Sequence, residues 1–345
     1  IKPCVSANVG DQFDESNQSL MSKAFSWFYL SINFGSFFST LFIPYLLNRY
    51  GAKVAFGVPG ILMLLATVLF VMGRKKYVRI PPAGFPKINF LSVNAFLLTQ
   101  WRRLMKGDSA EQIAASKFPL ASVKAILSVW EILGLFVFVP VYWMLSDQST
   151  SEWVLQATKL DLNLFGMTLL PQQVQAANPV FILILTPLFS GVIYPWLTRK
   201  GIQFSTHRRM LTGFVLLIFS FVVIWGLEKG IEAGLHPSVW GQIFAYFLLT
   251  VAEILVYLTG LEYAYAKAPA SMKSTIMSFW LLTISLGNYL VSLINGNISS
   301  QGLLSQLTGS TYYLFFIVLM AIISLLFLIC FRKEMRGSSE ATIPQ

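Results

Sequence analysis

FLLTVAEILVYLTG, residues 247–260, places a single acid, Glu253, in an otherwise apolar run. The run extends on both sides, over about 238–265, which is long enough to cross the roughly 30 Å hydrocarbon core of a bilayer. Backbone groups find no water there, so a run of this length is expected to be a helix. An acid at its middle is costly in lipid and marks a functional position, most simply a carboxylate that faces a cavity and meets a cation or a proton. The alternative is a structural carboxylate, held protonated between helices.

Seven further apolar runs occur along the 345 residues, of which 55% are hydrophobic and only 12% charged. That charged fraction is about half of the ~25% found in soluble domains. The sequence therefore predicts an all-α membrane protein that crosses the bilayer several times. The expected spans are at about 24–47, 53–73, 122–147, 178–198, 209–227, 238–265, 272–296 and 311–331.

The basic residues are distributed unevenly between the two sets of loops. Twenty of the 25 lysines and arginines lie beside alternate ends of the spans, and only Arg49, Lys53, Lys159 and Lys229 lie at the opposite ends. Lys2 belongs to neither set. Basic loops stay in the cytoplasm, so this asymmetry predicts a cytoplasmic C-terminus. The net charge of +10 then reflects membrane topology and does not indicate a nucleic-acid partner.

The spacing of the spans predicts an unequal division of the chain. Residues 1–73 hold two spans, and 122–334 hold six, the number in one bundle of a transporter built from paired six-helix bundles. Between them, 74–121 form a cytoplasmic linker in which NFLSVNAFLLTQWRRLMKG (89–107) predicts an amphipathic helix on the inner leaflet. Residues 335–345 are a cytoplasmic tail.

Polar side chains within apolar segments supply the other candidates for a site. Asn33 and Asn178 interrupt spans, where an amide either binds a ligand or joins helices. Asp147 ends a span, where a solvated interfacial acid is the alternative, and Lys2 lies in a helix-like stretch. Trp143 and Trp280 lie at mid-span, where they either line a cavity or fill the core.

Enzyme and metal signatures are missing from the sequence. It contains no GxxxxGK[ST] loop for a nucleotide and no GxSxG or HExxH motif for hydrolysis. Its two cysteines and two histidines have no metal-binding spacing. Two classes of function remain: a carrier driven by an ion gradient, and a membrane-embedded receptor.

Several motifs resemble the proton-dependent oligopeptide transporter family, a branch of the major facilitator superfamily. They follow the family's order along nearly the whole chain. The motifs are IKPCVSANVGDQF (1–13), FYLSINFGS (28–36), YWMLSDQSTSEWVLQA (142–157), QAANPVF (175–181) and GLEYAYAKAPASMKS (260–274).

This resemblance implies a fold of twelve membrane helices in two bundles, of which the chain would hold helices five to twelve and the end of helix four. It implies proton-coupled symport of di- and tripeptides by alternating access, in a bacterial inner membrane. A monomer would suffice, with no cofactor beyond the proton gradient. The family's ExxER cluster has no match in these residues, and we expect it upstream of them.

The resemblance also implies roles for the candidate residues. Lys2 would engage the peptide carboxylate or the coupling acids, and Asn33 the peptide backbone. Asn178 and Glu253 would hold the amino end, Trp143 and Trp280 would shape side-chain pockets, and Asp147 would serve as an outer-gate acid in proton coupling.

Two alternatives stay open at this point. One is a related carrier of another small anion or zwitterion, such as nitrate or an amino-acid derivative. The other is a peptide sensor on the same fold that does not transport.

Overall fold

A computed structural model describes residues 8–9, 12–13, 20–78, 88–202, 204–267, 272–300, 302 and 304–336. Within these ranges, seven helices are long and apolar enough to cross a membrane, and one bent pair of helices can supply an eighth span. The predicted all-α, polytopic class is confirmed.

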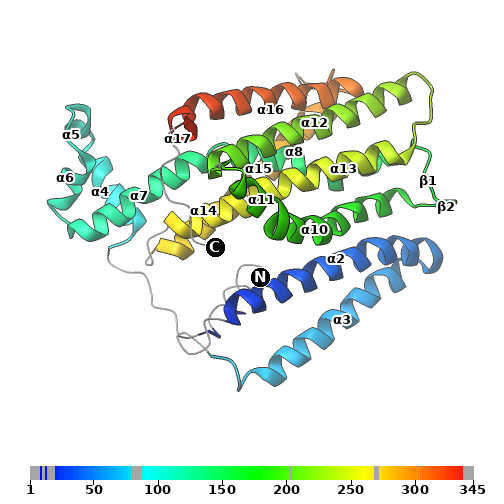
Figure 1. The fold of residues 1–345 in the computed structure, drawn as a ribbon, viewed down its shortest axis with the longest axis horizontal. Helices are drawn as coiled ribbons and strands as arrows, with labels where there is room; N and C mark the ends of the chain where they lie inside the picture. The colour runs from blue at the N-terminus through cyan, green and yellow to red at the C-terminus, as the bar shows by residue number, and fades with distance from the viewer. Residues whose placement is uncertain are drawn as a thin grey trace.

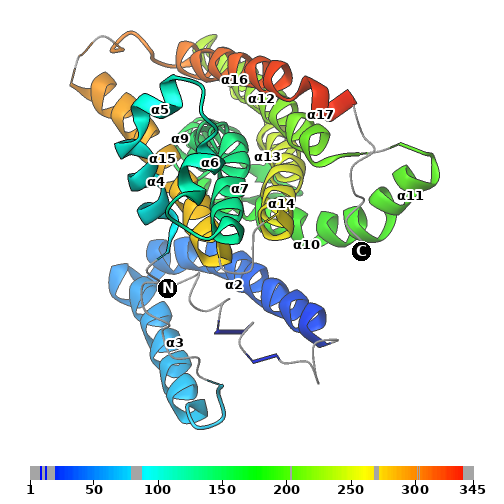
Figure 2. The same cartoon turned by 90° about the vertical axis from the view of Figure 1, so that its left-hand side faces the viewer.

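The first two spans form an antiparallel pair, α2 (Met21–Tyr50) and α3 (Ala52–Gly73). Gly51 joins them with a positive φ of 78°, a conformation that glycine adopts without a steric penalty. The pair is set to one side of the other helices, with α2 alongside α10 (Figures 1 and 2).

The linker folds into three short helices at one end of the molecule (Figure 1). They are α4 (Phe90–Thr99), α5 (Trp101–Met105) and α6 (Ala110–Ala115). The single helix expected over 89–107 is thus divided at Gln100. Asn89 begins α4 with a capping box, because its side chain accepts from the Ser92 N–H while the Ser92 hydroxyl accepts from the Asn89 N–H.

The third span, predicted over about 122–147, is bent. It comprises α7 (Leu120–Phe136), α8 (Val139–Ser146), η2 (Asp147–Thr150) and α9 (Glu152–Ala157), with a bend of 41° after Phe136. Pro140 lies in the first turn of α8. Proline has no N–H to donate and crowds the carbonyl four residues earlier, which accounts for the break.

Two further spans contain a wide π-helical turn. One runs from η3 (Pro171–Ala176) through α10 (Ala177–Leu188), η4 (Phe189–Ile193) and α11 (Tyr194–Arg199). The other runs from α13 (Val239–Glu253) through η5 (Ile254–Leu258) to α14 (Thr259–Lys267). Single π-helical turns of this kind occur frequently at functional sites.

The remaining spans are α12 (Thr206–Glu232), α15 (Lys273–Ser299) and α16 (Ser310–Cys330), followed by the short α17 (Arg332–Arg336). A two-stranded hairpin of β1 (Asn163–Leu164) and β2 (Met167–Thr168) lies at the end opposite α4–α6 (Figure 1).

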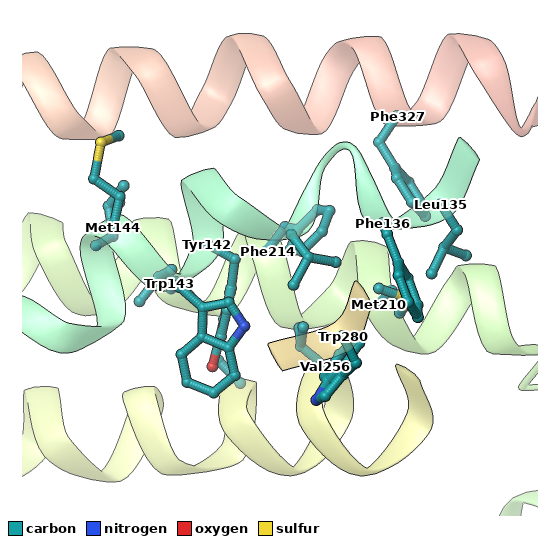
Figure 3. Close-up of a cluster of buried hydrophobic side chains, with 14 of the residues drawn as sticks. Leu135, Phe136, Tyr142, Trp143, Met144, Met210, Phe214, Val256, Trp280 and Phe327 are labelled. Carbon is teal, nitrogen blue, oxygen red and sulfur yellow. The ribbon is translucent and has the colours of Figure 1, made fainter. Parts of the chain in front are cut away.

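The core of the bundle lies where α8, α12, α15 and α16 meet. Phe214 meets Phe327 edge to face at 5.2 Å, and Phe136 meets Trp280 at 5.1 Å (Figure 3). Lipid is as apolar as these side chains, so close van der Waals packing holds the helices together.

Candidate functional site

A hydrogen-bonded pair of polar side chains joins α10 to α13 inside the bundle. Asn178 Nδ2 donates to Glu253 Oε2 at 3.0 Å and to Thr250 Oγ1 at 3.1 Å. Thr250 in turn donates to the Tyr246 carbonyl at 2.7 Å. The two residues predicted to share a role are therefore in direct contact, 75 positions apart in sequence.

Glu253 keeps one oxygen for other partners. Within the described part of the chain, its Oε1 has no hydrogen bond or ion pair, and the side chain is only partly buried. Glu253 also ends α13 and directly precedes the π-helical turn η5. A carboxylate with an open oxygen, placed mid-span at an irregular turn, is suited to accept hydrogen bonds from a ligand.

A second acid lies close to this pair. Asp147 follows α8, is hydrogen-bonded to the Asn288 side chain of α15, and interacts electrostatically with Glu253. The hydroxyls of Tyr142 and Tyr257 also lie within electrostatic range of Glu253. The site thus combines two acids with amide and phenol groups, a set that favours a cation or a proton.

The two predicted tryptophans border the site through Tyr257. Its ring centroid lies 6.0 Å from that of Trp143 and 6.0 Å from that of Trp280. Figure 3 shows Trp143 from α8 and Trp280 from α15, both directed toward α13 and η5. Both indoles are buried, and neither indole N–H donates to any described atom.

The remaining predicted residues belong to the N-terminal part of the chain. Asn33 lies on α2 and is buried, at 7% exposure, but no described contact joins it to Glu253. Lys2 lies outside the described residues. The α2–α3 pair does contact the main group of helices, because Gln173 Nε2 of η3 donates to the Leu41 carbonyl of α2 at 2.8 Å.

Sequence reasoning missed three of the polar side chains around the acids. Tyr142, Tyr257 and Asn288 lie on three different segments, α8, η5 and α15, and only the packing of these segments brings them to Glu253 and Asp147. Of the three, Tyr142 could have been found from the sequence, because it directly precedes Trp143 within one motif. Among the described residues, no group of histidine, cysteine and acid side chains could hold a metal ion.

The chain was compared with protein-family models and with known proteins. The model of the PTR2 or POT family matches residues 1–304. Solute carrier family 15 member 2 of Rattus norvegicus is 37% identical over 264 residues, which cover 73% of this chain and 36% of the relative. Peptide transporter 3 of Caenorhabditis elegans is 39% identical over 260 residues, 71% of this chain and 36% of the relative. The chain spans little more than a third of the length of these relatives.

Solved structures agree with the sequence matches. The POT family transporter PepTSo superposes with a TM-score of 0.86 at 33% identity, covering 98% of this chain and 76% of that one. Another proton-dependent oligopeptide family transporter gives a TM-score of 0.75 at 35% identity, covering 95% and 75%. The protein is therefore an integral membrane protein with a transporter fold, and the chain belongs to the POT family.

Proposed function

We propose that the protein is a proton-coupled symporter of di- and tripeptides that works by alternating access. The hydrogen-bonded Asn178–Glu253 pair, with Asp147 nearby, is the observation on which this proposal rests. The acidic site suits the ammonium end of a zwitterion, because an opposite charge compensates for the loss of water around each group. The names of the relatives, which include peptide transporters, support the same substrate class.

The other predicted residues complete the proposed mechanism. Lys2 binds the peptide carboxylate from the N-terminal bundle, so that a bound peptide draws the two bundles together. Asn33 contacts the peptide backbone, while Trp143 and Trp280 shape pockets for varied side chains. Contacts to groups that all peptides share, combined with aromatic walls, account for broad specificity.

Proton coupling follows from the interaction between the two acids, Asp147 and Glu253. Symport requires that proton and substrate are bound together, so we assign them to different carboxylates: Asp147 takes the proton, and Glu253 keeps its charge for the ammonium group. Protonation of Asp147 removes a like charge near Glu253, which favours the charged form of Glu253 that binds the ammonium group. The proton gradient supplies the energy, and the mechanism uses no cofactor.

We place the protein in the plasma membrane, with the basic loops, the α4–α6 linker and the C-terminus in the cytoplasm. The charge asymmetry of the loops supports this orientation. The animal relatives do not bear on a bacterial host, so the bacterial inner membrane remains a prediction, as does function as a monomer.

Gradient-driven uptake tests the proposal. In proteoliposomes with an acidic exterior and a negative interior, we expect dipeptide uptake that ceases when the proton gradient is dissipated. Glu253→Gln should abolish this uptake, because the amide neither attracts an ammonium group nor titrates. Uptake that does not depend on the proton gradient would refute symport.

The matched control is Glu111→Gln, which removes an acid that is partly exposed on α6 of the linker, with 44% of its side chain accessible. It should transport normally. If Glu253→Gln transports as well as Glu111→Gln, then Glu253 has no role in binding or coupling.

A further inference from the structure

A polar cavity lies at the end of the bundle opposite the α4–α6 linker. It has a volume of about 320 Å³ and lies between α9, the end of α12, the end of α15 and the start of α16. None of the candidate residues at the Glu253 site lines it. The side chains that carry its chemistry are Glu152, Gln156, Lys159, Glu228, Asn295 and Tyr312.

The cavity contains a buried acid that the sequence does not single out. Glu228 lies near the end of α12 and is only 4% exposed. Gln156 Nε2 donates to its Oε2 at 2.8 Å, and Lys159 Nζ approaches its Oε1 at 3.5 Å. Lys159 itself is 57% exposed at the side chain, so solvent weakens this ion pair.

Gln156 leaves an acceptor without a donor. The residue is 2% exposed and its amide N–H groups bond to the Ile224 carbonyl and to Glu228. Its Oε1 is buried and accepts no hydrogen bond within the described ranges. A buried polar atom without a partner costs stability that a bound donor can restore.

Glu152 supplies a second acceptor. Its carboxylate has no hydrogen bond or ion pair to any described residue, although it interacts electrostatically with Tyr312 and Tyr313. Glu152, Gln156 and Lys159 recur at intervals of four and three residues, so they lie on one face of α9 and its extension. Asn295 Oδ1 is already occupied by the Tyr312 hydroxyl, at 3.0 Å.

The chemistry of the cavity selects the kind of ligand. Two carboxylates, Glu152 and Glu228, face one lysine, so the charged groups of the lining leave a net negative charge, and the carbonyl oxygen of Gln156 adds an acceptor that has no described donor. An anion would be repelled, whereas a primary ammonium group has three N–H donors and one positive charge. The faces of Tyr312 and Tyr313 can add cation–π attraction.

We propose that this cavity is a second binding site, which takes the primary ammonium group of a small amine or of a peptide's amino end. The site does not depend on the proposed symport, because it uses none of the residues that surround Glu253.

Ligand binding to the purified full-length protein tests this proposal, with n-propylammonium as the probe and neutral n-propanol as its matched control. Measurements in the Glu253→Gln background exclude the first site. We expect saturable binding of n-propylammonium alone. Removing one charged acceptor costs about 1.5–3 kcal/mol, so Glu152→Gln should weaken binding by about 10-fold or more.

Glu152→Gln is the main variant because its carboxylate has no partner to lose, and Glu111→Gln should bind as the parent does. In the same background, Ala-Ala binding that N-acetylation and Glu152→Gln both abolish identifies a peptide's amino end as the ligand. Binding of n-propylammonium without Ala-Ala identifies free amines. Equal binding of n-propylammonium and n-propanol, or no effect of Glu152→Gln, would overturn the proposal.

Discussion

Two glycines allow the tryptophans of the first site to lie against neighbouring helices. A Cβ atom at Gly260 would collide with the Trp280 ring. A Cβ atom at Gly287 would lie 2.6 Å from the Pro140 carbonyl oxygen and 2.7 Å from the Trp143 Cβ. The contact at Gly287 involves the Pro140 backbone, which cannot move aside as a flexible side chain can. Gly260 therefore allows α14 to lie close to α15, and Gly287 allows α15 to lie close to α8.

Gly287→Ala should destabilise the protein by forcing α15 away from α8. Overpacking of this kind costs about 1–3 kcal/mol, and we expect a lower thermal midpoint in detergent together with weaker dipeptide binding. Gly296→Ala is the matched control, because it lies on the same helix with no atom within 4 Å of the added Cβ. Equal midpoints for the two variants would contradict this packing argument.

Some residues of the site could be predicted from the sequence and others could not. Glu253 and Asn178 were found because an isolated polar side chain in an apolar span needs a partner or a ligand. Their direct contact follows from packing, as does the placement of Asn288 beside Asp147. Glu228 was missed because the predicted span ended at 227, whereas α12 continues to Glu232. A charged residue close to the end of a span is expected whether or not it is buried, so the sequence does not predict the burial of Glu228.

At the scale of elements, proline explains only some of the irregular helices. Pro140 accounts for the bend between α7 and α8, and Pro187 and Pro195 flank the π-helical turn in α10 and α11. The prolines are visible in the sequence, but neither the break in the third span nor its angle of 41° was predicted from them. The turn after Glu253 has no proline, so nothing local predicts it. Only the tertiary structure reveals that the acid lies at a π-helical turn.

A hydrogen bond between the α2–α3 pair and the main group of helices offers a test of alternating access. The hydrogen bond from Gln173 to the Leu41 carbonyl connects η3 with α2 in the half of the protein that carries the β-hairpin. Gln173→Ala removes it. Hydrogen bonds between membrane helices contribute about 0.6–1.7 kcal/mol, so conformers open on this side should increase severalfold.

Distances between spin labels at Leu47 and Phe165, both exposed, measure this shift once Cys4 and Cys330 are replaced by serine. We expect a larger population at long distance in Gln173→Ala. The neighbouring Gln172→Ala, which changes an exposed residue, should match the parent. A distance distribution that Gln173→Ala leaves unchanged would show that this contact does not hold the side closed.

At the scale of the whole molecule, the basic segments and the two polar sites lie in different regions. The basic loops and the α4–α6 linker lie at one end, the Glu253 site lies within the bundle, and the cavity lined by Glu152 and Glu228 lies at the other end. The sequence predicted the spans and the linker because both depend on length and periodicity. It did not predict the division of the linker helix at Gln100 or the cavity lined by Glu152 and Glu228, since both depend on packing between distant segments.

The central claim is that Glu253 holds the amino end of a peptide. Its most direct test is the affinity of the purified protein for Ala-Ala and for N-acetyl-Ala-Ala, measured in the Glu152→Gln background so that the cavity lined by Glu152 and Glu228 does not contribute. We predict that the parent prefers the free amine by about 10-fold or more, the value of one charge-assisted hydrogen bond, and that Glu253→Gln loses most of this preference. An equal preference with and without the Glu253 carboxylate would contradict the claim.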